Sequence, residues 1–232
     1  MHEVEDGRMS REKAQAKIEE WVVGVSTPAF EAAIELKIAV GVAEGDYRFK
    51  NESERLVMRN GARRFFAEFA RKIIELSDGR CVYFAPDIRA KARGVDNAMA
   101  WAEYAIHAVT SSGRPISGKD YWERLFNQTK LENLDVIEQI IRKEDCFARI
   151  ANGHPERDSI IFVGASKEGR RLEIVTRLDE YGNVEADLTE VTVVVTRRKC
   201  PEIIEPPPMP LAEVVKTVAQ HQAAGFSPST VT

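Results

Sequence analysis

His107 is the residue whose type and setting best suit acid–base chemistry. It lies in the stretch WAEYAIHAVTSSG, which runs from Trp101 to Gly113 and has the composition of a helix. Residues three and four apart are neighbours on a helix, so Glu103, His107 and Thr110 share a polar stripe beside an apolar face. Histidine titrates near neutral pH and can therefore take or give a proton in a cleft. The alternative is an ordinary surface histidine that pairs with Glu103, and the sequence leaves both interpretations open.

A second chemical signal is a local concentration of positive charge. Lys167, Arg170, Arg171 and Arg177 fall close together in a chain whose formal net charge is -4. Arginine binds phosphate oxygens through a planar fork and keeps its charge, so such a cluster is the footprint expected of phosphate contact. The alternative is that these charges protect a sheet edge and its hairpin tips.

Motifs for metals and cofactors do not appear in the sequence, and we expect neither a metal nor a cofactor. There is no phosphate-binding P-loop and no dinucleotide-binding glycine motif. The histidines and cysteines lack metal-ligand or disulfide spacing. These residues are His2, His107, His154, His221, Cys81, Cys146 and Cys200.

Composition predicts a globular chain with a sizeable core. Hydrophobic residues make up 44% and charged residues 30% of 232 positions. The formal net charge of -4 argues against a bulk-basic nucleic-acid binder. The first residues, MHEVEDGRMSREKAQ, have no apolar core of a signal peptide, and no apolar run approaches the length of a membrane span. We therefore expect a cytoplasmic protein without a membrane partner.

The elements that must position these residues are helical up to about Gly113. Helices are predicted over residues 10–22, from Ser26 or Thr27 with Pro28 at the first position, over 51–76, and from Asp96 through His107. After Gly113, a loop (GRPISGKDYWERLF) leads into a short helix, and ENLDVIEQIIRKEDCFARIA reads as a second amphipathic helix.

Three strand patterns follow. Residues 160–163, 171–178 and 188–196 alternate or are rich in β-branched side chains, and short glycine-containing links join them. They predict an antiparallel meander with one face against the preceding helices. A proline-rich linker then leads to residues 211–219, where Leu211, Val214 and Val218 predict a helix that docks on the protein.

The predicted fold is α+β, with a helical N-terminal region followed by helices packed on a small antiparallel sheet. We expect a helical region at 1–95, an α+β domain at 96–200, and the linker with its docking helix at 201–232.

The order of elements between residues 99 and 199 resembles a known family. A helix histidine, the segment DYWERLFNQTKLENLDVIEQII and the hairpin SIIFVGASKEGRRLEIVTRL together look like the phage-associated nuclease domains grouped with barnase, EndoU, colicin-type and RelE-like RNases. The family commonly has a second histidine after the first, where this chain has Ser112-Gly113. An acid–base pair of histidines is therefore missing at that place.

The resemblance implies a metal-independent endoribonuclease of phage or prophage origin, with RNA as its partner. Carried over to this chain, it places the general base at His107, further catalytic groups at Arg171 and Thr176, and substrate-binding cations at Lys167, Arg170 and Arg177. The alternative is a non-catalytic phage accessory module that keeps the fold and binds a phage or host protein. A nuclease should gather basic residues within about 10 Å of His107, whereas a module should expose an apolar patch.

Overall fold

The computed structural model describes residues 3–86, 94–118, 122–151, 154, 158–178, 188–199 and 209–225, without the side chains of 3–10, 188–199 and 225. It has the mixed α+β fold that the sequence predicts. Contacts divide the chain into two units that interleave along the sequence. Unit 1 comprises Met1–Ala16, Ile73–Tyr83 and Asp135–Thr232, and unit 2 comprises Lys17–Lys72 and Phe84–Leu134. The expected domain boundaries at residues 95 and 200 stay predictions, because contacts alone do not show which parts fold independently.

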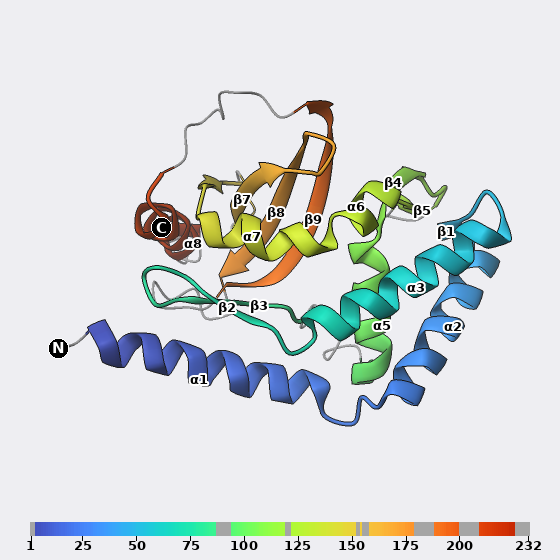
Figure 1. Ribbon diagram of the computed structural model, residues 1–232, viewed down its shortest axis with the longest axis horizontal. Coiled ribbons are helices and arrows are strands. Elements are labelled where there is room, and N and C mark those ends of the chain that lie inside the picture. Colours follow the sequence, from blue (N-terminus) through green and yellow to red (C-terminus); the bar gives the residue numbers. More distant parts are fainter. Residues whose placement is uncertain are drawn as a thin grey trace, which may run out of the picture. The chain divides into compact units, whose positions relative to one another are not determined.

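Unit 1 contains a six-stranded sheet in the order β2-β3-β9-β8-β7-β6 (Figure 1). Neighbouring strands are antiparallel except β3 and β9, which are parallel. The strands are β2 (Ile73–Glu75), β3 (Cys81–Tyr83), β6 (Cys146–Arg149), β7 (Ser159–Ala165), β8 (Arg170–Leu178) and β9 (Leu188–Lys199). The predicted meander is confirmed, since β7, β8 and β9 pair consecutively and antiparallel.

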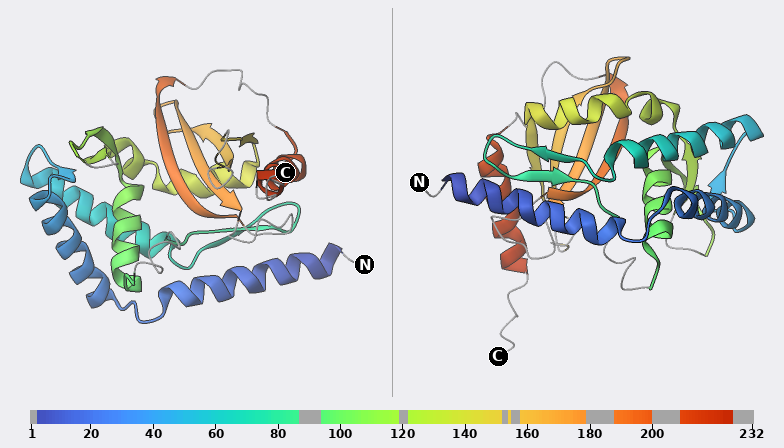
Figure 2. Two further views of the ribbon diagram at one scale, coloured as in Figure 1. Left: turned by 180° about the vertical axis from the view of Figure 1, so that it is seen from behind. Right: turned by 60° about the horizontal axis from the view of Figure 1, so that its bottom comes forward.

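The face of this sheet that contacts α7 (Ile137–Lys143) is apolar. A Cβ on Gly164 of β7 would lie 2.5 Å from Cγ1 of Ile140, so Gly164 faces this helix. Figure 1 shows α7 across β7 and β8, and the left view of Figure 2 shows it behind them. Side chains alternate between the faces of a strand. The buried residues on the same face as Gly164 include Ile160, Phe162, Leu172, Ile174 and Thr176.

We expect Gly164→Ala to lower the free energy of unfolding by about 1–3 kcal/mol, the usual cost of overpacking. The added methyl group would push against Ile140, which cannot move without displacing α7 from the sheet. Urea unfolding measures the change. In the same assay, Ile140→Ala should cost less in the Gly164→Ala background than in the wild type; equal costs would contradict the close approach.

Helix α8 (Leu211–Gly225) docks against β6 and β7, as its amphipathic pattern predicts. Leu211, Val214 and Val218 are buried. At its other end, Nδ1 of His221 lies 2.6 Å from the carboxylate of the fully buried Asp158. The helix is thus held by its apolar face and by the contact between His221 and Asp158.

Unit 2 packs its helices around aromatic side chains. Phe30 stacks on Phe66 with ring centroids 3.9 Å apart, and Phe66 meets Trp101 edge to face. The indole N–H of Trp101 donates to the carbonyl of Trp21 at 3.1 Å. The helices and strands that lie largely in this unit are α2 (Thr27–Ala43), β1 (Tyr47–Arg48), α3 (Glu52–Phe69), α5 (Asn97–Ala108), β4 (Thr110–Pro115), β5 (Trp122–Phe126) and α6 (Gln128–Glu132). Helix α1 (Glu3–Val22) contributes to both units.

Two predicted helix starts in unit 2 are confirmed by their capping bonds. The Ser26 hydroxyl accepts the N–H of Ala29 at 3.3 Å, and the Asp96 carboxylate accepts the N–H of Met99 at 2.9 Å. These side chains satisfy N–H groups that have no partner within their own helix.

Several predicted elements are wrong. Helix α3 ends at Phe69 instead of continuing to residue 76, because the β-branched Ile73 and Ile74 pair with β3. The predicted loop GRPISGKDYWERLF forms most of a hairpin, in which β4 pairs antiparallel with β5 and β1 pairs parallel with β5. The short helix expected after that loop is present as α6. The helix predicted over 132–151 is instead a short 3-10 turn (Leu134–Val136), the short helix α7 and strand β6. Helix α1 begins at Glu3, earlier than predicted.

Candidate functional site

The predicted site residues fall in both units. His107 lies on α5 in unit 2, whereas the predicted hydroxyl and cations lie in unit 1, in or beside β8. We therefore describe each group with the neighbours in its own unit. The unit 1 residues are Lys167, Arg170, Arg171, Thr176 and Arg177.

The side chain of Thr176 forms a hydrogen bond within the sheet. Its side chain is fully buried on the face toward α7, and its hydroxyl donates to the carbonyl of Ile160, the residue opposite it on β7, at 2.9 Å. This bond satisfies the hydroxyl inside the core. The hydroxyl therefore lies on the opposite face from Arg171.

The cations at the tip of the β7–β8 hairpin are paired with acids. Nζ of Lys167 lies 2.6 Å from a carboxylate oxygen of Asp135, and Nε of Arg170 lies 3.3 Å from a carboxylate oxygen of Glu168. These side chains are about half exposed, so solvent screens the pairs. The local positive charge is thereby partly neutralised.

Arg171 belongs to a more buried cluster, in which two guanidinium groups hold one carboxylate. Its Nε donates to Oε1 of Glu173 at 2.9 Å, and Nη2 of Arg149 donates to Oε2 of the same side chain at 2.7 Å. The Arg171 and Glu173 side chains are only 13% and 11% exposed, whereas Arg149 is 47% exposed. We call Arg149, Glu173 and Arg171 the Glu173 triad; its formal charge is +1.

The register of the sheet positions the Glu173 triad. Arg171 and Glu173 alternate with residues that face α7, so both point to the other face. On that face Val163 lies directly opposite Glu173, and it packs with Phe147 and Ile161 in an apolar cluster. The guanidinium of Arg171 lies 5.8 Å from the centre of the Phe147 ring, which suits a cation–π contact. The ionic groups thus pack against buried apolar side chains, and electrostatic interactions are stronger in such surroundings than in water.

Two members of the Glu173 triad were missed by sequence reasoning. Glu173 counted only as a polar residue in the alternation of its strand, and Arg149 lay in a segment predicted to be helical. The available signal was the pattern Arg-x-Glu within a strand, which places two opposite charges on one face. Arg149 joins them only through the pairing of β6 with β7 and β7 with β8.

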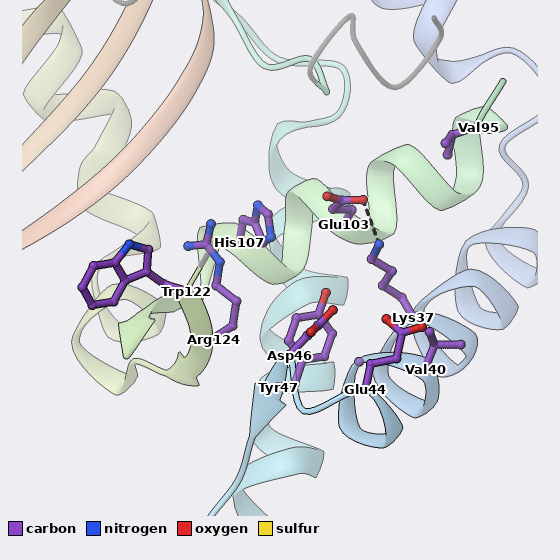
Figure 3. Close-up of a pocket in the computed structure, with 11 residues that line it drawn as sticks. Lys37, Val40, Glu44, Asp46, Tyr47, Val95, Glu103, His107, Trp122 and Arg124 are labelled. Atoms are coloured by element: carbon purple, nitrogen blue, oxygen red, sulfur yellow. Dashed lines mark hydrogen bonds and ion pairs between the residues drawn. The ribbon is translucent and has the colours of Figure 1, made fainter. Parts of the chain in front are cut away.

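His107 lines a separate cavity of about 490 Å³ within unit 2 (Figure 3). The walls come from α2, the turn after it, β1, α5 and β5. Figure 3 shows the His107 ring beside the Arg124 guanidinium, and Lys37 Nζ donates to Glu103 Oε2 at 2.9 Å nearby. Glu103 therefore pairs with a lysine of another helix.

Burial and positive neighbours keep His107 uncharged. Burial, followed by the charge of Arg124, lowers the pKa of His107 to about 3, while Glu103 acts in the opposite direction. At neutral pH the imidazole can accept a hydrogen bond through one nitrogen and donate through the other. A pKa this low also makes His107 a weak base, because a general base works best with a pKa near the operating pH.

Lys130 is a second perturbed group near this cavity. Its side chain is buried in α6, and its Nζ donates to the carbonyl of Thr110 at 2.6 Å. Burial and the neighbouring charge of Arg124 lower the pKa of Lys130 to about 7. Arg124 and Lys130 thus bring cationic groups close to the uncharged His107. Sequence reasoning did not anticipate them, because they lie in segments whose structure was predicted wrongly or only loosely.

Within the described part of the chain, no helix combines the length and apolar content that a membrane span needs. No protein-family model, curated protein or solved structure matches the chain significantly. The function must therefore be inferred from the sites themselves.

Proposed function

We propose that the protein is a metal-independent endoribonuclease whose active site is the Glu173 triad. The observation that carries the proposal is the Glu173 carboxylate held between the guanidinium groups of Arg149 and Arg171 on one face of the sheet. A carboxylate can accept a proton, and arginine fits the oxygens of a phosphodiester. Base and cations are thereby in one place, as RNA cleavage requires.

The reaction uses side chains of this protein and a proton from solvent. Glu173 accepts the proton of a ribose 2′-hydroxyl, and the 2′-oxygen attacks the adjacent phosphorus. The bond from phosphorus to the 5′-oxygen breaks, and that oxygen takes a proton from solvent. The products are a 2′,3′-cyclic phosphate and a free 5′-hydroxyl. Arg149 and Arg171 stabilise the charge that develops on the phosphorane oxygens.

The guanidinium of Arg149 has the capacity for this role, because its side chain is 47% exposed and an arginine has five N–H donors, of which Nη2 supplies the bond to Glu173. Arg177 follows on the same face of β8, and Arg170 and Lys167 lie at the hairpin tip. In this proposal Arg177 contacts a phosphate that flanks the cleaved bond, whereas Arg170 alternates with Arg171 and Lys167 pairs with Asp135, so neither is assigned to that role.

Arg149→Gln tests the proposal directly. We expect it to slow cleavage of labelled RNA in the presence of a chelator by about 10²–10³-fold, the usual cost of losing one donor to a developing oxyanion. The matched control is Arg142→Gln on α7, whose guanidinium is half exposed and pairs with Glu138 on its own helix. Cleavage that is absent in the wild type, or equal in wild type and Arg149→Gln, contradicts the proposal.

A second candidate function is a protein-interaction module, and one observation favours it. Helix α2 exposes Leu36, Val40 and Val42 by 53%, 41% and 44%, respectively. Exposed apolar side chains on one element are typical of surfaces that bind other proteins. This candidate predicts no RNA cleavage at all, so the experiment above separates the two functions.

A further inference from the structure

The cavity of unit 2 contains the guanidinium of Arg124. Among the described residues, none forms an ion pair or hydrogen bond with the Arg124 guanidinium, although its backbone N–H donates to Asp46. The nearby Glu103 carboxylate is paired with Lys37. Burial lowers the pKa of the half-buried Arg124 guanidinium, and the attraction of Tyr47 and Glu103 offsets only part of the lost hydration. An anion that enters the cavity would supply the missing partner.

We propose that this cavity binds a nucleotide, with the phosphate on Arg124 and the base on Trp122. The proposal concerns unit 2 and goes beyond the cleavage assigned to the Glu173 triad. It stands or falls independently of that activity, because it requires only binding.

Trp122 and Arg124 are placed to act together. They are two residues apart on β5, so their side chains leave the same face of the strand about 6.6 Å apart. Trp122 lines the cavity and is 51% exposed, which is unusual for so large an apolar side chain. An aromatic ring stacks on any base, and an adjacent arginine binds the phosphate of the same nucleotide.

The remaining walls complement a nucleotide. His107 lies beside Arg124 and carries no charge, so it can donate an N–H to a phosphate oxygen or accept a ribose hydroxyl. Figure 3 shows Glu44 and Asp46 on the α2 side of the cavity, away from Trp122. Their carboxylates can accept hydrogen bonds from hydroxyl or amino groups. The volume of about 490 Å³ is that of an ordinary small-molecule site.

Calorimetric titration of the full chain with adenosine 5′-monophosphate tests the site. We expect binding that Arg124→Gln weakens about tenfold or more, because a charge-assisted fork of hydrogen bonds is lost. Arg64→Gln, which removes an exposed arginine from α3, is the matched control and should bind like the wild type. Circular dichroism checks that each variant is folded.

Ligands that lack the nucleobase or the phosphate test whether the nucleobase stacks on Trp122. Trp122→Ala should weaken binding of adenosine 5′-monophosphate but leave ribose 5-phosphate unchanged, and adenosine without phosphate should bind far more weakly to the wild type. A 5′-phosphorylated trinucleotide shows whether the natural ligand is the end of a nucleic-acid strand or a free nucleotide. Tighter binding than the mononucleotide indicates a strand end, and weaker binding indicates a free nucleotide.

Three results would overturn the nucleotide site: no binding of any of these ligands at millimolar concentration, equal weakening by the Arg124 and Arg64 variants, or equal affinity for ribose 5-phosphate and adenosine 5′-monophosphate. None of them bears on RNA cleavage by the Glu173 triad, which is measured separately.

Discussion

Replacing Glu173 with glutamine should lower metal-free RNA cleavage by about 10²–10⁴-fold, the usual contribution of a positioned general base. Glutamine keeps the size and the hydrogen-bonding oxygen of the side chain but cannot accept a proton at neutral pH. The two bonds to Arg149 and Arg171 become weaker because the acceptor loses its charge. The measurement is the rate of cleavage of a labelled RNA in chelator, with the cyclic phosphate product identified.

Two companion variants make this result decisive. Glu173→Asp keeps the charge on a shorter side chain and should retain more activity than Glu173→Gln if the carboxylate is the base. His107→Asn removes the base that the sequence predicts, and we expect it to leave cleavage close to wild type. Loss of cleavage in His107→Asn with full activity in Glu173→Gln would instead assign the base to α5. Urea unfolding shows whether each variant is folded at the assay temperature.

Lys130→Met should remove a large part of the pH dependence of stability above neutrality. The pKa of Lys130 is about 7 in the folded protein and near its ordinary value of 10.5 in the unfolded chain. Between these values the unfolded chain binds more protons, so wild-type stability rises with pH and is fully gained only above 10.5. From pH 7 to pH 9 this lysine should add about 2 kcal/mol to the free energy of unfolding.

The measurement is urea unfolding at pH 7, 8 and 9. At pH 7 the variant should be at least as stable as the wild type, because methionine avoids the cost of burying an ammonium group. Lys50→Met is the control, since the Lys50 side chain is 88% exposed. Parallel pH dependence in wild type and Lys130→Met would show that Lys130 keeps its charge in the folded state.

Local signals in the sequence predicted local structure well. Ser26 and Asp96 are capping residues, and both begin helices where expected. The meander could be predicted because the strands alternate or are rich in β-branched residues and a glycine-containing turn joins β7 to β8. Gly169 in that turn has a φ of 72°, a conformation that glycine adopts without strain.

Elements that depend on distant partners could not be predicted in this way. Strand β5 has Tyr47–Arg48 of β1 on one side and β4 on the other, and the segment WERLF alone carries no sign of either pairing. In the candidate sites the same limit applies. Arg171 and His107 could be selected by residue type alone. Glu173, Arg149 and Arg124 can be recognised as site residues only from the neighbours that the fold places beside them.

The interleaving of the two units has a consequence for synthesis of the chain on the ribosome. The hairpin of β2 and β3 emerges early, but the strand that pairs with β3 is β9, since Val82 pairs with Leu188. All of unit 2 is translated before β9, and its last segment, Phe84–Leu134, separates the two strands. The edge of β3 that pairs with β9 therefore stays unpaired until β9 has been translated, by which time unit 2 can already fold. A pairing between strands so distant in sequence is also slow to form. An exposed strand edge on a nascent chain is a place where chaperones or neighbouring chains can bind first.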